Sequence, residues 1–203
     1  CCALLDAVMA GEMPGVPPAL PLEGLRLAVP TSFVLDDLDT DVSAAFERTV
    51  AALSSAGARI SEIPFSELAD IPKINAGGGI YAEAYAIHRR LIEERGDEYD
   101  PRVRERILRV KDYSAADFVD MLTAREVLIS SANATTAPYD AIILPTTPSV
   151  APPIADLEAD DKLYVGANML MLRNTFCFNF LDRCALSLPM HRDGEPPTGL
   201  MVV

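Results

Sequence analysis

Residues 139–148 read YDAIILPTTP, and this stretch decides the class of fold that the sequence predicts. Residues 141–144 form a continuous apolar run that Pro145 ends. Because side chains alternate between the two faces of a strand, an unbroken apolar run indicates a strand covered on both faces, in the middle of a sheet. The polar, proline-rich loop that follows is therefore predicted to leave the carboxyl end of a central strand, where open α/β proteins usually bind ligands.

The part of the chain before this strand predicts a parallel pair. Residues 25–29 alternate as a short strand, residues 41–56 place apolar side chains at helical spacing before Gly57, and residues 58–63 alternate again. A strand, a helix and a strand within about 40 residues form a βαβ unit, whose strands are parallel with a right-handed crossover.

The other predicted elements surround this unit. A short amphipathic helix should end at Gly11, and a long helical segment should break at the three glycines 77–79. The remaining elements are helices from Pro101 (burying Val103, Ile107 and Val110), from Ala115 and over 165–180, and strands over 185–188 and 199–203. The sequence thus predicts an α/β fold with a mixed, centrally parallel sheet flanked by helices on both faces.

Composition excludes several classes of partner. The chain has 203 residues, with 17 Lys and Arg against 30 Asp and Glu, for a net charge of -13. Such a charge repels phosphate backbones and anionic lipid, so we expect no direct nucleic-acid partner and no membrane partner. No apolar stretch approaches the roughly 18 residues of a membrane span, and no signal peptide is recognisable. By elimination we expect a cytoplasmic protein, and a homodimer is the protein assembly left open.

Metal, cofactor and triad chemistry find little support in the sequence. Cys1 and Cys2 are neighbours, and Cys177 and Cys184 lack the paired spacing that zinc sites use, so free thiols in a reducing compartment are expected. His88 and His191 stand apart, and neither makes a convincing catalytic base. We therefore predict no metal and no cofactor.

Tyr81 and Arg89 are eight residues apart in a predicted helical segment. This spacing allows both side chains to point into one cavity and to offer a phenol and a guanidinium to a carboxylate. The same spacing also describes an aromatic core residue and a surface arginine. Spacing alone favours the second interpretation.

Several stretches together resemble the amidase signature family. They are GLRLAVP (24–30), YDAIILPTTP (139–148), APP (151–153), NT (174–175), NFL (179–181), ALSLP (185–189) and GEPPTGLM (194–201). Their order and spacing resemble the C-terminal half of such an enzyme. The resemblance implies that residues 1–203 are the C-terminal portion of a single amidase domain, truncated at both ends.

The chemistry that the resemblance implies is amide hydrolysis by a serine nucleophile, with a second serine in a cis peptide bond and a lysine base. In the family these residues precede the segment seen here. The chain has no GGSSG stretch, its serine pairs 54–55 and 130–131 fall in predicted helices, and its lysines are not placed like the family base. We therefore expect no catalytic residue in this chain, and no activity from it alone.

The same resemblance implies a pocket for a small-molecule amide substrate. The segment from Gly77 to Arg89 is similar to the branch that hydrolyses carboxylated ureas such as allophanate, in which Tyr81 and Arg89 would grip the substrate carboxylate. Thr146, Thr147 and Asn174 would either shape the pocket or pin loops. Two alternatives stay open, namely the amidase component of a glutamine-dependent aminoacyl-tRNA amidotransferase and a non-catalytic interaction module. The sequence around Leu172 argues against glutamine.

Overall fold

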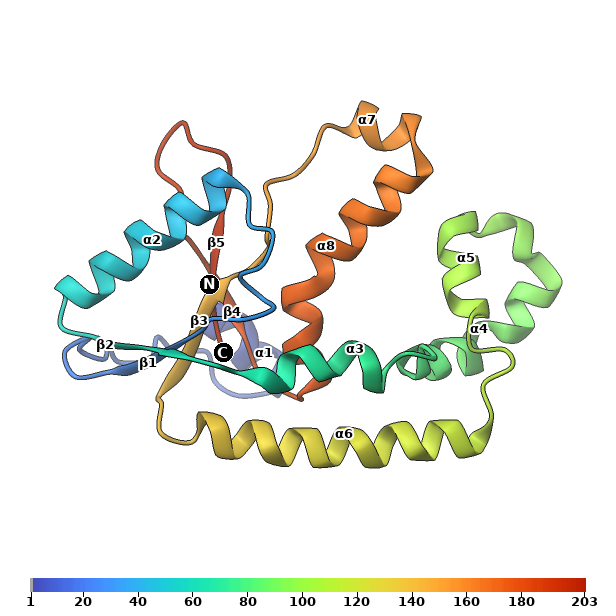
Figure 1. The fold of residues 1–203 in the computed structure, drawn as a ribbon, viewed down its shortest axis with the longest axis horizontal. Coiled ribbons are helices and arrows are strands. Elements are labelled where there is room, and N and C mark those ends of the chain that lie inside the picture. The colour runs from blue at the N-terminus through green and yellow to red at the C-terminus, as the bar shows by residue number, and fades with distance from the viewer. Residues whose placement is uncertain (1) are drawn as a thin grey trace. The chain divides into compact units, whose positions relative to one another are not determined.

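A five-stranded mixed sheet forms the centre of the first of two units (Figure 1). The computed structural model describes residues 2–203. The first unit contains the residues up to Phe65 and those from Thr135 onward, and the second contains Ser66–Ala134. The strand order is β2-β1-β3-β5-β4, so that β3 lies in the middle as predicted. The strands are β1 (Arg26–Pro30), β2 (Arg59–Ile63), β3 (Ala141–Pro145), β4 (Leu186–Pro189) and β5 (Gly199–Val202).

The pairing of these strands confirms the mixed, centrally parallel sheet. β1 pairs in parallel with both β2 and β3, whereas β5 is antiparallel to its neighbours β3 and β4. The central strand β3 is buried from its second residue to Pro145. Its unbroken apolar run therefore indicated the correct position in the sheet.

Helices α2 (Thr40–Ser55) and α8 (Asp161–Phe180) lie on opposite sides of the sheet (Figure 1). The buried face of α2, with Phe46 at its centre, joins one core cluster with Leu27 of β1 and Ile143 of β3. The C-terminal half of α8 carries the fully buried Phe178 and Phe180. Gly57 follows α2 with a φ of 97°, the left-handed conformation expected there. Helices on both faces of the sheet are thus confirmed.

Two further helices belong to the first unit. α1 (Cys2–Ala10) contains no buried residue, although four of its residues are large and apolar. α7 (Ile154–Ala159) was not predicted from the sequence. It has only six residues, too few for a helical apolar pattern to be recognised.

The second unit is helical. It contains η1 (Ser66–Asp70), α3 (Ile71–Ile74), η2 (Gly79–Tyr81), α4 (Ala82–Arg95), η3 (Gly96–Glu98), α5 (Pro101–Leu108) and most of α6 (Ala115–Thr136). The predicted break falls at the three glycines, where a Cβ on Gly77 would lie 2.2 Å from Cε2 of Tyr113. The glycines thus permit close backbone approach to an aromatic ring.

Side-chain caps begin α5 and α6. The Asp100 carboxylate accepts a hydrogen bond from the backbone N–H of Arg102 at 2.9 Å, and Ser114 and Asp117 form a reciprocal capping box. The burial expected of Ile107 and Val110 is confirmed. The burial expected of Val103 is wrong, because this side chain is 46% exposed in the first turn of a short helix.

Neither a membrane helix nor a metal cluster occurs in the part of the chain that the structure describes. Among residues 2–203, no helix combines the length and the apolar character that crossing a membrane requires. No group of three or more His, Cys, Asp or Glu side chains in that range is placed to hold a metal ion. Cys2, Cys177 and Cys184 are free thiols, and Cys1 lies outside the described residues. Burial raises the pKa of the Cys177 thiol to about 12.

Asp140, just before β3, is bound to Arg26 of β1. Its carboxylate accepts hydrogen bonds from the Arg26 backbone N–H at 2.8 Å and from Nη2 at 2.6 Å. These bonds lower the pKa of Asp140 from 3.8 to about 2. A lowered pKa in the folded state means that the ionised carboxylate contributes stability above the unfolded pKa, and that this contribution is lost as the pH falls through about 2.

We therefore expect Asp140→Asn to lower the Tm at about pH 6, and the difference from wild type to narrow as the pH falls from about 4 towards 2. Thermal unfolding followed by circular dichroism checks this. Asp112→Asn is the control, because Asp112 is exposed and has no ion pair among the described residues. A difference between Asp140→Asn and wild type that grows on acidification would contradict the expectation.

Candidate functional site

Two loops leave neighbouring parallel strands at the same edge of the sheet. Residues 31–39 follow β1, and residues 146–150 follow β3. We call them the strand-end loops. Because the carboxyl ends of adjacent parallel strands meet at one edge, this is the position at which open α/β folds bind ligands.

Asp39 joins the two strand-end loops. Its carboxylate accepts a hydrogen bond from the Val42 N–H at 2.8 Å, which caps α2, and another from the Val150 N–H at 2.6 Å. Its own backbone N–H donates to the Pro148 carbonyl at 3.0 Å. One residue thus fixes the second loop to the start of α2.

Asn174 joins the same loops from the other side of the sheet. It is fully buried on α8, and its Nδ2 donates to the carbonyl of Val34 at 3.1 Å and to that of Pro145 at 2.8 Å. Its Oδ1 accepts from Nε of Arg173 at 3.1 Å. Both amide protons are therefore used, so Asn174 acts on the strand ends by holding their backbone.

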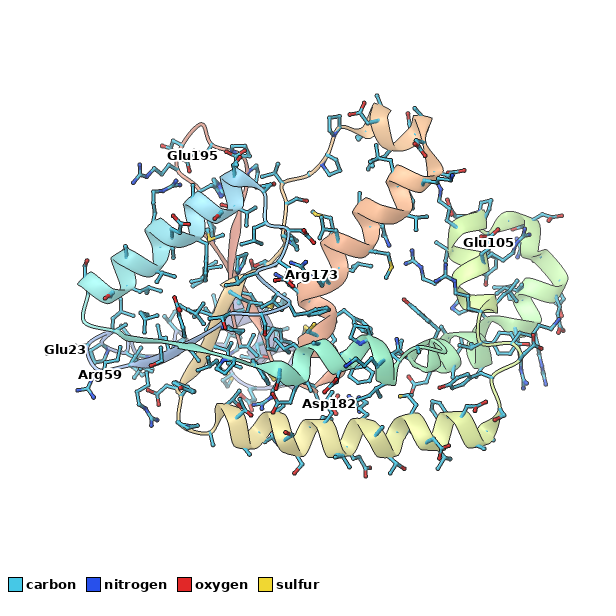
Figure 2. All side chains as sticks on the ribbon, viewed as in Figure 1. Glu23, Arg59, Glu105, Arg173, Asp182 and Glu195 are labelled. Carbon is cyan, nitrogen blue, oxygen red and sulfur yellow. The ribbon has the colours of Figure 1, made fainter. Side chains whose placement is uncertain are left out.

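Arg173 holds an irregular part of the first loop (labelled in Figure 2). Its guanidinium donates to the carbonyls of Val34 at 3.2 Å and Asp36 at 2.6 Å, and lies 5.8 Å from the centre of the Phe33 ring. Phe33 and Asp37 have φ values of 63° and 51°, which lie in the left-handed region that residues other than glycine rarely adopt. Partial burial lowers the pKa of Arg173, which stays protonated at neutral pH.

Thr146 and Thr147 are the first residues of the second loop, and their hydroxyls differ in hydrogen bonding. Thr147 Oγ1 donates to the Ser149 carbonyl at 3.1 Å. Thr146 Oγ1 lies 2.6 Å from Oγ of Ser187 on β4, and the two hydroxyls share one hydrogen bond. Each hydroxyl carries one proton, so this pair keeps an O–H available to a ligand. Gly199 makes room for it, because a Cβ there would lie 2.4 Å from the Ser187 oxygen.

Tyr81 and Arg89 belong to the second unit. Tyr81 is half-buried at the end of η2, and Arg89 is exposed in α4. In the described part of the chain, no acidic side chain pairs with Arg89 and no group bonds the Tyr81 hydroxyl. A helix rises about 12 Å over eight residues, a span that an arginine reaching back towards the helix N-terminus can partly close. That Tyr81 and Arg89, like Thr146, Thr147 and Asn174, bind the substrate stays a prediction.

A small pocket on the first unit lies apart from these residues. Its lining includes Asp41, Arg48, Glu195 and Thr198, and its volume is about 50 Å³. Arg48 and Glu195 form an ion pair at 2.6 Å across it, and the buried Thr198 hydroxyl has no partner (Glu195 is labelled in Figure 2). This volume suits one or two water molecules rather than a substrate.

Four side chains that could act as nucleophile or base make local contacts. The hydroxyl of Ser131 in α6 donates to Glu67 at 2.8 Å, and Lys73 forms an ion pair with Asp70 at 2.7 Å. His88 Nδ1 is 2.8 Å from the Tyr99 hydroxyl, and His191 Nδ1 is 3.2 Å from the Thr198 carbonyl. Each of these chemically able side chains is engaged in a local contact.

Sequence reasoning missed Asp39, Arg173 and Ser187. A signal existed for Asp39, since an aspartate directly before an amphipathic helix is a typical N-cap. No signal existed for the other two. Their partners lie far away in the chain, with Ser187 bonding a residue 41 positions away and Arg173 one 139 positions away.

The fold defines an open α/β protein whose strand-end loops lie where such folds usually bind ligands. The Amidase family model matches residues 16–203, and the chain belongs to the amidase family. The predicted resemblance is thereby confirmed.

Individual proteins are also similar to this chain. 2-Amino-5-chloromuconic acid deaminase from Comamonas testosteroni is 29% identical over 201 residues, which are 97% of this chain and 43% of the deaminase. The structural match to a crystal structure of an amidase covers 98% of this chain and 45% of the amidase chain, with a TM-score of 0.78 and 23% identity. The match to the structure of allophanate hydrolase from Kluyveromyces lactis covers 90% of this chain and 29% of the hydrolase chain, with a TM-score of 0.76 and 22% identity. The chain thus spans less than half the length of these relatives.

Proposed function

We propose that this chain is the C-terminal portion of an amidohydrolase that acts on a small, carboxylate-bearing substrate. The reaction adds water across a C–N amide bond, so that the amide yields a carboxylic acid and ammonia or an amine. The serine nucleophile, the cis serine and the lysine base would be supplied by polypeptide outside these residues. The observation that carries the proposal is an exposed Arg89 without an acidic partner among the described residues, in a chain of the amidase family.

The electrostatics of the chain support a role for Arg89 in binding. With a net charge of -13, the chain as a whole repels small anions. An anionic substrate therefore needs a local cation that is not already neutralised by a neighbouring carboxylate. A guanidinium offers parallel N–H donors that match the two oxygens of a carboxylate, and the Tyr81 phenol can add a third donor.

The names of two relatives agree with such a substrate. The deaminase similar to this chain is named for an acid, and the hydrolase with the similar fold is named for allophanate. Both substrates carry a carboxylate. A deaminase and an amidase each break a C–N bond, so the relatives support the class of bond and the anionic group.

The strand-end loops would also take part in substrate binding. We propose that Thr146 faces the substrate with the proton left over in its pair with Ser187. Thr147 and Asn174 would shape the pocket indirectly, since their polar atoms hold backbone carbonyls.

The proposal is tested by ammonia release from matched substrates. We expect the uninterrupted amidase polypeptide containing this chain to hydrolyse a carboxylated amide such as allophanate with a kcat/KM roughly 100-fold or more above that of its neutral methyl ester, because a binding-site cation left unpaired rejects the neutral analogue. The 203-residue chain alone should release no ammonia. Equal kcat/KM values for both substrates would contradict the carboxylate. Preference for glutamine would identify the amidotransferase alternative, and no hydrolysis of any amide would favour the non-catalytic module.

A further inference from the structure

Asp193 and Gly194 lie at the tip of the turn that precedes β5, and they are the one Asp-Gly pair in the sequence. Both residues are exposed, and a Cβ built on Gly194 would meet nothing within 4 Å. Among residues 2–203, no group forms a hydrogen bond or an ion pair with the Asp193 carboxylate or with the Gly194 backbone N–H. The two groups are therefore free to react with each other.

An aspartate that precedes a glycine can rearrange its own backbone. The nitrogen of the next residue attacks the carbon of the protonated side-chain carboxyl group, and a C–N bond closes a five-membered succinimide ring. The nitrogen proton and the carboxyl O–H leave together as water.

Water then adds to one of the two ring carbonyls. Addition at the main-chain carbonyl breaks the bond between that carbon and nitrogen, so that the chain runs through the aspartate side chain as an isoaspartyl residue. Glycine favours the first step, because it has no Cβ to crowd the attacking nitrogen. Every other aspartate in this chain precedes a residue with a side chain.

Glu195 (labelled in Figure 2) closes the turn at this pair. Its backbone N–H donates to the Arg192 carbonyl at 3.0 Å, and its carboxylate accepts from the Arg192 N–H at 3.0 Å. Gly194, the third residue of the turn, has a φ of 85°, as a type II turn requires. The closed turn fixes the peptide that joins Asp193 to Gly194. This peptide has to rotate before its nitrogen can reach the side-chain carbon, so the turn must open first.

An ion pair to α2 holds the turn closed. The Glu195 carboxylate oxygen that accepts from Arg192 also accepts from Nη2 of Arg48 at 2.6 Å. The two side chains of the pair are 33% and 36% exposed, and ion pairs that are open to solvent are weak. The pair therefore slows the opening of the turn without preventing it.

We propose that Asp193 is a site of spontaneous isoaspartate formation, and that the ion pair between Arg48 and Glu195 limits the rate by keeping the turn closed. Water is the only reagent, and the reaction involves no change of oxidation state. The proposal is independent of the proposed amidase function.

The rearrangement would change the edge of the sheet that carries the strand-end loops. β5 is antiparallel to β3, so the turn before β5 lies at the carboxyl end of β3, where the Gly199 carbonyl accepts from the Thr146 N–H at 2.7 Å. An isoaspartyl residue adds one carbon atom to the main chain of this turn. The added atom would disrupt the two turn bonds and move Glu195 away from Arg48, which opens the small pocket that both residues line.

The test counts isoaspartyl residues in the 203-residue chain. The chain is incubated for weeks at neutral pH and body temperature. Samples are then treated with a protein-isoaspartate methyltransferase and labelled S-adenosylmethionine. We expect methyl incorporation to rise with time, tandem mass spectrometry to place the isoaspartate at residue 193, and Asp193→Ser to abolish the signal.

Two variants test the ion pair. Arg48→Ala and Glu195→Gln remove it from opposite sides, and each should accelerate isoaspartate formation roughly two- to fivefold, because the turn opens more often. Arg59→Ala is the matched control, since Arg59 is an exposed arginine of the same unit without an ion pair among the described residues, and its rate should equal that of wild type. Circular dichroism at the incubation temperature selects the variants that stay folded.

Three results would overturn the proposal. The first is a signal in wild type no higher than in Asp193→Ser, and the second is isoaspartate located at a different aspartate. The third is an equal rate in wild type, Arg48→Ala and Glu195→Gln, which would show that the ion pair does not limit the reaction.

Discussion

Replacing Asn174 with alanine is expected to lower the free energy of unfolding by about 1–3 kcal/mol, because the Pro145 carbonyl loses the donor that Asn174 supplies, and a buried unsatisfied group costs about that much. The Val34 carbonyl also loses Asn174 but keeps its hydrogen bond from Arg173, and both carbonyls belong to buried residues. The change also removes the acceptor for Nε of Arg173. Urea unfolding followed by circular dichroism measures the effect.

Asn168 provides a control of the same residue type on the same helix. Its Nδ2 is buried and has no hydrogen-bond partner, so Asn168→Ala removes an unsatisfied donor and should change stability by less than about 0.5 kcal/mol. Asn174→Asp should be worse than Asn174→Ala, since it turns a carboxylate towards two carbonyl oxygens. Equal effects at positions 168 and 174 would show that the hydrogen bonds to the strand ends do not stabilise the fold.

The elements with strong local patterns could be predicted from the sequence. The apolar run of β3 indicated a central strand, and the βαβ unit followed from a helix between two short strands. These predictions worked because burial on one or both faces leaves a periodic trace in the sequence. The capping of α5 by Asp100 and the glycine break before α4 were also recognisable, since each depends on neighbouring residues.

The contacts that shape the candidate site could not be predicted in the same way. Asn174 was selected through a family resemblance, but its bonds to Val34 and Pro145 depend on how α8 packs beside two loops. The Thr146 and Ser187 pair depends on the register of β4 and β5. The exposure of α1 could not be predicted either, because the apolar spacing of a helix does not show which surface will cover it.

Arg89 carries the second large expected effect, and it concerns substrate selection. Truncation to alanine in the uninterrupted enzyme removes a charge-assisted hydrogen bond worth about 1.5–3 kcal/mol, which corresponds to an increase of roughly 10-fold to 150-fold in KM for a carboxylated amide. For a neutral amide of the same shape, Arg89→Ala should raise KM by less than about threefold, because that substrate makes no such contact with Arg89. Arg89→Lys should recover part of the loss, since it keeps the charge but not the planar pair of donors.

Arg90→Ala is the matched control, because Arg90 is the neighbouring residue on α4, is exposed like Arg89 and has the same charge. Its side chain points about 100° away around the helix, so its removal should change KM for either substrate by less than about twofold. A general loss of positive potential would affect both variants alike. The comparison therefore separates a specific contact from electrostatic attraction at a distance.

The most direct test of the account is the ratio of KM values for the carboxylated and the neutral amide, measured for wild type, Arg89→Ala and Arg90→Ala. We expect Arg89→Ala alone to abolish the preference for the carboxylated amide, with kcat changing little for either substrate. An unchanged preference in Arg89→Ala, or the same loss in Arg90→Ala, would contradict the claim that Arg89 binds the substrate carboxylate.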